Sequence, residues 1–177
     1  MPVSAKSLES IIKYSGKGKT IEVIKKLHAL KDVPGLDKVI ADMGQYWSKF
    51  RGGIFQLDYA EQLLNSGKKI SFEVSDLSDD LRRIYDITYE AFEDGRRIQK
   101  RLELKNWNNF YQSTVKSQLV KDLAKMEYLG DIQWIFNKTE NIPNMGKLKD
   151  NVLKALKKAD GSPVEELIDN LDEIKVQ

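Results

Sequence analysis

The spacing of apolar residues changes along the chain and separates a helical beginning from a strand-rich middle. In residues 1–50, apolar side chains recur every three or four positions, which is the spacing of one face of an α-helix. The residues that carry this pattern are Leu8, Ile11, Ile12, Ile21, Ile24, Leu27, Val39, Met43, Tyr46, Trp47 and Phe50. Gly16 and Gly18 interrupt the first two predicted helices. Pro34 is expected to open the third, because a proline in the first helical turn loses no hydrogen bond.

The middle of the chain, residues 51–140, switches to the alternation that is typical of strands. An apolar-periodic stretch at 54–64 first predicts a helix that ends at Asn65–Ser66–Gly67. Strands are then predicted at 69–74, 82–92, 96–107 and 132–136. Asp94–Gly95 can supply the positive φ angles of a tight turn, so the second and third strands are expected to form a hairpin.

The remaining segments are predicted to be helical. A long helix is expected between Asn108 and Gly130, and two amphipathic helices are expected at 147–159 and 163–174. The core order is therefore helix, three strands, helix, strand, an α+β arrangement with a mixed central sheet. We expect a helical segment at 1–50, the core at 51–140, and C-terminal helices at 141–177 that pack on the core.

Composition narrows the class of protein. A length of 177 residues with 41% hydrophobic and 32% charged residues suits one compact soluble domain. The absence of cysteine excludes disulfides, thiolate zinc sites and cysteine nucleophiles. No stretch is long and apolar enough to span a membrane, and the first residues have no signal-peptide pattern. In residues 1–50, nine lysines and five acidic residues leave a net charge of +4.

Acidic and basic side chains meet on the predicted hairpin. Strand alternation puts Glu103 and Lys105 on one face of the third strand, with Leu102 and Leu104 on the other. Asp86, on the neighbouring strand, is expected to lie beside Glu103 across the tight turn. Two carboxylates can hold Mg²⁺, or another divalent ion such as Mn²⁺ or Zn²⁺, and the lysine can activate water. The sequence therefore predicts a metal-dependent site for phosphodiester hydrolysis.

A plainer interpretation stays open for the same residues. An exposed sheet face with cross-strand ion pairs to Arg82 or Arg101 would show the same pattern. The spacing Glu-x-Lys is also expected by chance in a chain this rich in both residues, and it recurs at Glu173–Lys175. Only the hairpin context distinguishes Glu103–Lys105 from the second occurrence.

The segments Tyr85–Asp86–Ile87 and Leu102–Glu103–Leu104–Lys105–Asn106–Trp107 resemble the PD-(D/E)XK nuclease superfamily. The resemblance covers about residues 52–138, and the order of predicted elements is the same. It implies that Asp86, Glu103 and Lys105 are catalytic, and that Asp86 and Glu103 hold the metal together with Glu61 on the preceding helix. It also implies an assisting role for Gln118. Tyr85 stands where the proline of the motif would be.

Within that superfamily, the layout is similar to the nuclease domains of contact-dependent growth inhibition and other polymorphic toxins. This implies a delivered toxin that acts in the cytoplasm of a target cell and is neutralised by a cognate immunity protein. The implied substrate is RNA, with transfer RNA favoured over DNA. The residues expected to bind nucleic acid are Arg97, Lys100, Arg101 and Lys116. The alternatives are a DNA-cleaving toxin and a non-catalytic module that binds nucleic acid or protein. The sequence leaves the oligomeric state open.

Overall fold

The structure is a computed structural model of the whole chain. It describes residues 4–76, 83–107 and 131–137, together with residues 111, 113, 114, 117, 118, 150, 175 and 176. The chain divides into a first unit, Met1–Ser75 with Ile84–Leu104, and a second unit, Asp76–Arg83 with Lys105–Gln177. The described residues form both helices and strands, which confirms the α+β class. In the described part of the chain, no helix is long and apolar enough to cross a membrane.

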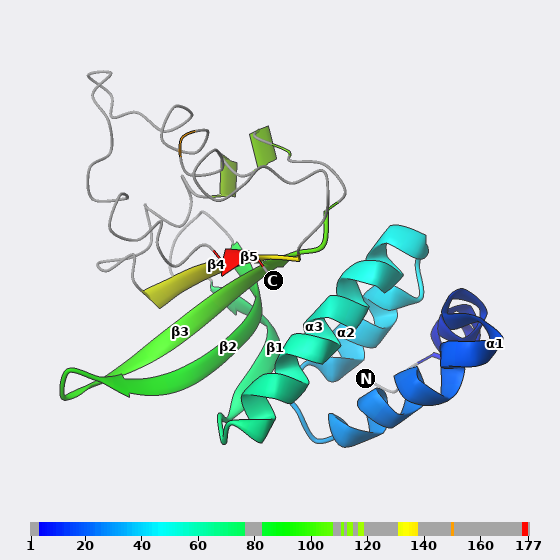
Figure 1. Cartoon of the computed structure of the whole chain (residues 1–177), viewed down its shortest axis with the longest axis horizontal. Coiled ribbons are helices and arrows are strands. Elements are labelled where there is room, and N and C mark those ends of the chain that lie inside the picture. The colour runs from blue at the N-terminus through cyan, green and yellow to red at the C-terminus, as the bar shows by residue number, and fades with distance from the viewer. Residues whose placement is uncertain are drawn as a thin grey trace. The chain divides into compact units, whose positions relative to one another are not determined.

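The first helix, α1 (Ala5–Ala29), joins the first two helices that the sequence predicted (Figure 1). Ser4 caps its N-terminus, where the Ser7 N–H donates to the Ser4 hydroxyl at 3.1 Å. Gly16 has φ 70° and ψ 167°, so the helix kinks there instead of ending. Glycine adopts this backbone conformation without a Cβ clash, and the predicted break therefore appears as a bend.

The next two helices, α2 (Leu36–Met43) and α3 (Trp47–Asn65), divide differently from the prediction. The sequence predicted that one helical segment ends at residue 50 and that the next helix begins at residue 54, but α3 runs through the two glycines between them, and the chain turns at Gly44–Tyr46 instead. Gly53 is where α2 meets α3, because a Cβ at this position would lie 2.1 Å from Met43 Cγ. Here glycine permits close packing of two helices and does not end one. The predicted boundary between residues 50 and 51 thus falls inside α3.

Three strands follow α3 in the first unit, close to their predicted positions: β1 (Ile70–Asp76), β2 (Arg83–Glu93) and β3 (Arg96–Lys105). They are neighbours in the order β1-β2-β3, and β2 pairs antiparallel with β3 from Ile87↔Leu102 to Glu93↔Arg96. Asp94 and Gly95 turn the chain with φ angles of 49° and 75°. The predicted Asp-Gly hairpin is confirmed.

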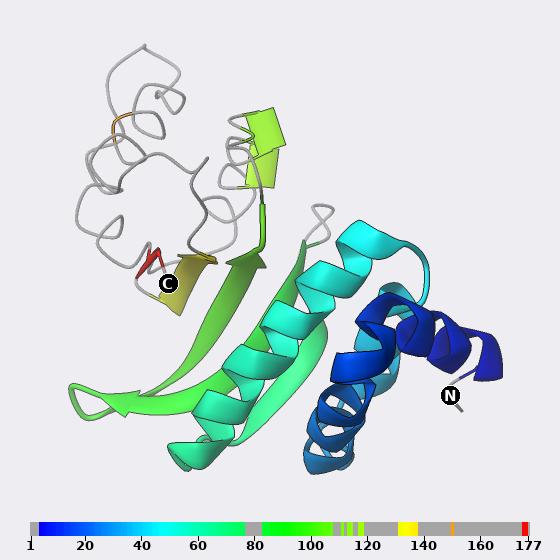
Figure 2. The same cartoon turned by 45° about the vertical axis from the view of Figure 1, so that its right-hand side comes forward.

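Buried apolar residues from the helices and strands form the core of the first unit. Those on α3 and the strands are Phe50, Phe55, Leu57, Ala60, Ile70, Phe72, Tyr85, Ile87, Leu102 and Leu104. Figures 1 and 2 show α3 lying along the strands, with α1 beyond it and farther from them. One side of α3 therefore faces the strands and another faces α1, which decides the surroundings of each polar residue on that helix.

In the second unit, β4 (Ile132–Phe136) matches its prediction and pairs in parallel with the short strand β5 (Lys175–Val176), which was not predicted. Ser113, Thr114, Ser117 and Gln118 are helical, as expected for the segment between Asn108 and Gly130. The rest of that segment lies outside the described residues. So do the helices predicted at 147–159 and 163–174, apart from Asp150, which is helical.

Candidate functional site

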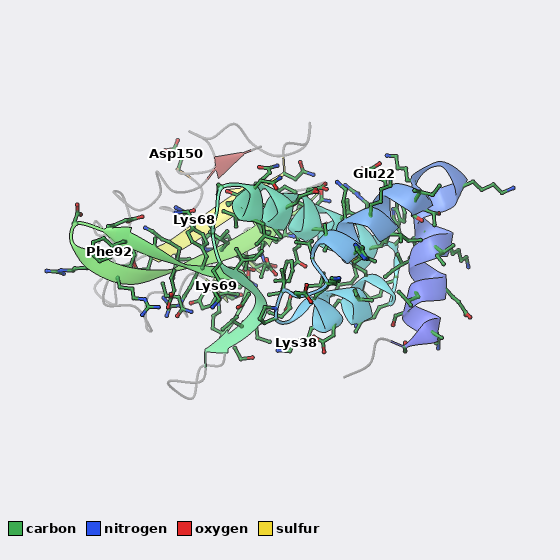
Figure 3. The ribbon with its side chains drawn as sticks, turned by 90° about the horizontal axis from the view of Figure 1, so that it is seen from below. Glu22, Lys38, Lys68, Lys69, Phe92 and Asp150 are labelled. Atoms are coloured by element: carbon green, nitrogen blue, oxygen red, sulfur yellow. The ribbon has the colours of Figure 1, made fainter. Side chains whose placement is uncertain are left out.

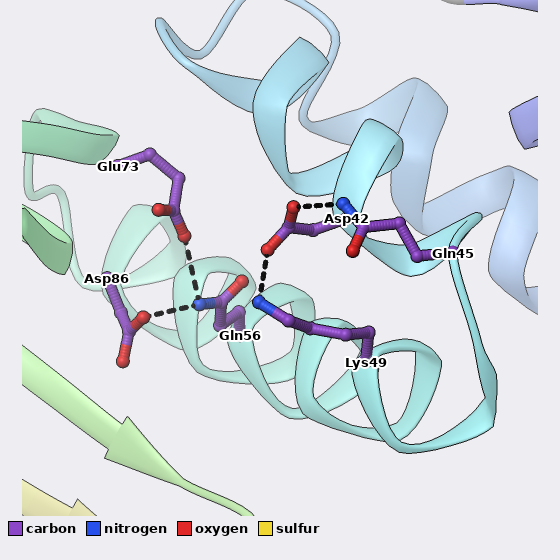
Figure 4. Close-up of polar contacts among 6 residues, drawn as sticks. All are labelled: Asp42, Gln45, Lys49, Gln56, Glu73 and Asp86. Carbon is purple, nitrogen blue, oxygen red and sulfur yellow. Dashed lines mark hydrogen bonds and ion pairs between the residues drawn. The ribbon is translucent and has the colours of Figure 1, made fainter.

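A glutamine on α3 joins acidic residues from two strands of the first unit (Figure 4). The Gln56 side-chain amide donates to Asp86 Oδ1 at 2.8 Å and to Glu73 Oε1 at 3.3 Å. The other oxygen of Asp86, Oδ2, accepts the backbone N–H of Leu104 at 2.6 Å. The Asp86 carboxylate is thus held on both sides, by a helix and by the neighbouring strand.

Local sequence explains where Asp86 points, and burial explains why Gln56 binds it. Asp86 lies between the buried residues Tyr85 and Ile87, so strand alternation sends its side chain to the opposite face. Gln56 lies between the buried Phe55 and Leu57 of α3 and is itself half-buried. A polar side chain in such surroundings needs hydrogen-bond partners, and the two carboxylates supply them.

Glu103 lies on the same face of the hairpin as Asp86. Asp86 and Glu103 are each the next residue beyond Ile87↔Leu102, which is the last pair of the β2–β3 register on this side. Glu103 is only 3% exposed, although carboxylates are seldom so deeply buried. The hydrogen bond from Leu104 N–H to Asp86 ties the two strands together at this point. Asp86 and Glu103 therefore both lie at the end of the paired stretch of the hairpin, where the Leu104 N–H holds the Asp86 carboxylate.

Glu73 is a third acidic residue of this region, and the sequence analysis did not select it. It lies on β1 with φ 48°, a conformation that is strained for a non-glycine residue. Burial raises the pKa of Glu73, and the nearby charges of Asp42 and Glu103 raise it further, while Gln56 and Lys49 act in the opposite direction. The signal that sequence reasoning passed over was an acidic residue between the apolar Phe72 and Val74 of a predicted strand.

Charged residues of α2 and α3 flank this network. Lys49 donates to Asp42 Oδ2 at 2.6 Å, and Asp42 Oδ1 accepts from Gln45 at 2.8 Å (Figure 4). The hydrogen bond to Asp42 raises the pKa of Lys49, which is partly opposed by burial. Lys38 donates to the backbone carbonyl of Glu73 at 3.1 Å. These contacts fix the helical side of the acidic cluster.

Glu61, the predicted third metal ligand, lies on another side of α3. Its carboxylate is 3.9 Å from the Lys26 ammonium, which also donates to Asp58 at 2.5 Å. Glu61 lies five positions after Gln56 in the helix, a rotation of about 140° around the helix axis. Gln56 therefore faces the strands while Glu61 faces α1. Within the described residues, no three acidic or histidine side chains are grouped closely enough to hold a metal ion between them.

Lys105 ends β3, two residues beyond Glu103 on the same strand face. It belongs to the second unit, where its ammonium lies 5.4 Å from the ring centroid of Trp107 and 5.3 Å from that of Trp134. Its backbone carbonyl accepts the Asn137 N–H at 2.8 Å. Lys105 is 8% exposed, so its charge is surrounded by indole rings rather than by bulk water.

Gln118 is helical, and its Oε1 atom is buried without a hydrogen bond in the part of the chain that the structure describes. A buried amide oxygen in this state is available to accept from a ligand or a water molecule.

The basic residues predicted to bind nucleic acid are largely engaged within the hairpin. Arg97 pairs with Glu90, and Lys100 pairs with Glu93 at 2.9 Å. The Arg101 guanidinium donates to the Gln99 backbone and side chain and lies 5.8 Å from the ring centroid of Tyr85. Lys116 lies outside the described residues. The Arg97–Glu90 pair is exposed, as on a solvated hairpin, whereas Lys100 is only 7% exposed.

No family model matches the sequence, and comparisons with curated proteins and with solved structures give no significant match either. The resemblance to the PD-(D/E)XK superfamily therefore rests on the residues quoted above and stays a prediction.

Proposed function

We propose that this chain is a divalent-metal-dependent phosphodiester hydrolase, an endonuclease that uses Asp86 and Glu103. The observation that supports the proposal best is the acidic network itself. Asp86 is held by Gln56 and by the N–H of Leu104, the residue that follows the buried Glu103, and Gln56 also binds the half-buried Glu73. Concentrating carboxylates in one partly buried place costs folding free energy, and such costs are typical of functional sites.

The donor set fits Mg²⁺ or Mn²⁺. Mg²⁺ is usually held by one or two protein carboxylates, with waters and substrate phosphate in its other positions, so a cluster of three protein ligands is not required. Asp86 and Glu103 provide hard carboxylate oxygens on adjacent strands. Each carboxylate oxygen has two lone pairs, so an Asp86 oxygen that accepts a hydrogen bond can also coordinate a cation. A bound cation would also offset the mutual repulsion of Glu73 and Glu103.

Each residue of the proposed site has its own role in hydrolysis. When bound, the metal lowers the pKa of a water molecule and stabilises charge on the phosphate. Asp86 is oriented by Gln56 and Leu104 before substrate arrives, which removes a reorganisation cost from the reaction. The resemblance assigns Lys105 to orienting the attacking water or to stabilising developing negative charge. The resemblance also assigns an assisting role to Gln118.

The biological role that follows from the resemblance is a delivered bacterial toxin domain. We infer that the substrate is RNA, with transfer RNA favoured over DNA, and that the partner is a cognate immunity protein. The net charge of +2 and the pI near 8.6 suit binding to a polyanion better than they suit a phosphate-mimicking inhibitor, which would be acidic.

A second candidate function is a non-catalytic binding module. It is favoured by the two internal hydrogen bonds of Asp86 and by the ion pairs of Arg97 and Lys100, which are the contacts of a purely structural network. The two candidates differ in whether the acidic network binds metal and whether its substitution abolishes cleavage.

The test incubates the purified protein with plasmid DNA or total RNA, in the presence of Mg²⁺, Mn²⁺ or EDTA, and measures cleavage. We expect Asp86→Asn and Glu103→Gln to lower cleavage by roughly 10²- to 10³-fold, equivalent to several kcal/mol of transition-state stabilisation. Glu90→Gln is the matched control, because Glu90 is an exposed acidic residue on the same strand as Asp86. Cleavage that survives Asp86→Asn would refute the site. No cleavage of either substrate by the wild type, together with no binding of Mn²⁺ in calorimetry, would favour the binding module.

A further inference from the structure

The outer face of α1 combines exposed isoleucines with lysines. Ile21 is 68% exposed and Ile24 is 50% exposed, although both are among the most apolar side chains. Lys17, Ile21, Ile24 and His28 recur at helical spacing, so they share one stripe, and all of them are exposed. Val23, which is 4% exposed, points roughly the other way, into the core. The isoleucine stripe is therefore the solvent side of a helix whose inner side is already packed.

The charges of α1 are strongly unbalanced. The helix contains six lysines and two glutamates. In the described part of the chain, five of these lysines make no ion pair: Lys6, Lys13, Lys17, Lys19 and Lys25. Lys26 is different, because it faces α3 and pairs with Asp58 and Glu22. The charge beside the exposed isoleucines is positive, because Lys17 and Lys25 lie within about 40° of Ile21 around the helix axis, whereas Lys19 lies nearly opposite.

The position of α1 leaves this face open within the first unit. Figures 1 and 2 show α1 as the helix farthest from the strands of that unit. In Figure 3, Glu22 on α1 and Phe92 on the β2–β3 hairpin are labelled at opposite ends of the unit. A large partner on the α1 face would therefore not need to displace the acidic network around Asp86.

We propose that the outer face of α1 binds an anionic lipid surface. Lysines would meet the negative headgroups, while Ile21 and Ile24 would enter the boundary between headgroups and acyl chains, as in helices that lie in the membrane interface. A nucleic acid would also attract the lysines, but its phosphate backbone would gain nothing from the isoleucines. The pairing of apolar and basic residues on one stripe therefore favours lipid. This proposal is independent of the nuclease chemistry.

The experiment is co-sedimentation of the full chain with vesicles of phosphatidylcholine alone, or with about one third phosphatidylglycerol. We expect binding only to the anionic vesicles, weakening as salt rises. Lys17→Gln and Lys25→Gln should each reduce the partition coefficient about fivefold, since one lysine near an anionic surface contributes a factor of that order. Ile21→Gln and Ile24→Gln should each reduce it by roughly five- to tenfold. All four side chains are exposed, so the fold should tolerate their replacement.

Two matched control variants remove a lysine charge or an apolar side chain elsewhere on the first unit. Lys69→Gln removes an exposed lysine just before β1, and Phe92→Gln removes an apolar side chain that is 75% exposed on the hairpin. Neither control should change vesicle binding.

Absence of binding to anionic vesicles would overturn the proposal, and so would equal losses from the control variants. Loss with the lysine variants but not with the isoleucine variants would refute insertion of the isoleucine stripe. If the four α1 substitutions combined abolish binding to an RNA fragment and leave vesicle binding unchanged, the face is a nucleic-acid surface instead.

Discussion

Replacing Asp86 tests whether the network that connects α3, β1 and β2 exists in solution. Its carboxylate accepts hydrogen bonds from Gln56 at 2.8 Å and from the Leu104 N–H at 2.6 Å. Asp86→Ala removes both acceptors and leaves two donors without a partner. Asp86→Asn keeps the size of the side chain and one carbonyl oxygen, and its amide N–H₂ can donate to Gln56 if the Gln56 amide rotates by half a turn.

The two variants should differ in stability by a measurable amount. Hydrogen bonds to charged groups contribute about 1.5–3 kcal/mol each, and Asp86 is only partly buried, so the lower end of the range applies. Asp86→Ala should therefore lower the free energy of unfolding by about 3 kcal/mol. Asp86→Asn should cost about 1 kcal/mol, since it can keep both partners as neutral hydrogen bonds.

Urea unfolding, followed by far-ultraviolet circular dichroism, measures these differences. Gln56→Ala in the wild type and in Asp86→Ala completes a double-mutant cycle, in which we expect a coupling of about 1 kcal/mol or more. Glu90→Ala serves as the control for loss of an exposed acidic residue on the same strand. If Asp86→Ala costs no more than Glu90→Ala, or if the cycle shows no coupling, the network does not hold Asp86 and the reasoning is wrong.

Three further outcomes follow from the same contacts. Glu73→Gln should stabilise the fold, and the effect should grow as pH rises. The pKa of Glu73 is raised in the folded state, so the ionised carboxylate destabilises the fold as pH rises toward that pKa, whereas glutamine stays neutral. Urea unfolding of both proteins between pH 4 and pH 8 measures this, and a difference that does not grow with pH would contradict it. Gly53→Ala should cost about 1–3 kcal/mol through overpacking against Met43, and it should cost less in a Met43→Ala background, as thermal unfolding of the four proteins would show. Millimolar Mn²⁺ should raise the melting temperature of the wild type but not that of Asp86→Asn; an equal rise in both would place the metal elsewhere.

Much of the strand layout could be predicted from the sequence alone. The alternation of apolar and polar residues predicted β1, β2, β3 and β4 within about two residues of their observed ends. The Asp94–Gly95 turn predicted the hairpin, and the hairpin predicted that Asp86 and Glu103 would share a face. These features depend on short-range properties, because side-chain direction in a strand repeats every two residues and the turn type is set by its own residues.

Only the tertiary structure decided which residues of the helices join the acidic cluster. Gln56 and Glu61 are both polar residues of α3, and nothing in their immediate sequence shows which one faces the strands. That choice depends on how α3 rotates between its neighbours, with Glu61 near Lys26 of α1 and Gln56 near Asp86 of β2. Gly53 likewise reads as a helix break until Met43 of another helix is seen against it. The sequence determined the direction of side chains along each strand, whereas the packing of α3 between α1 and the strands determined which of its polar groups reach the acidic residues. The physical reason is that a helix presents side chains on all sides, and the burial of its apolar residues against both neighbours selects its orientation.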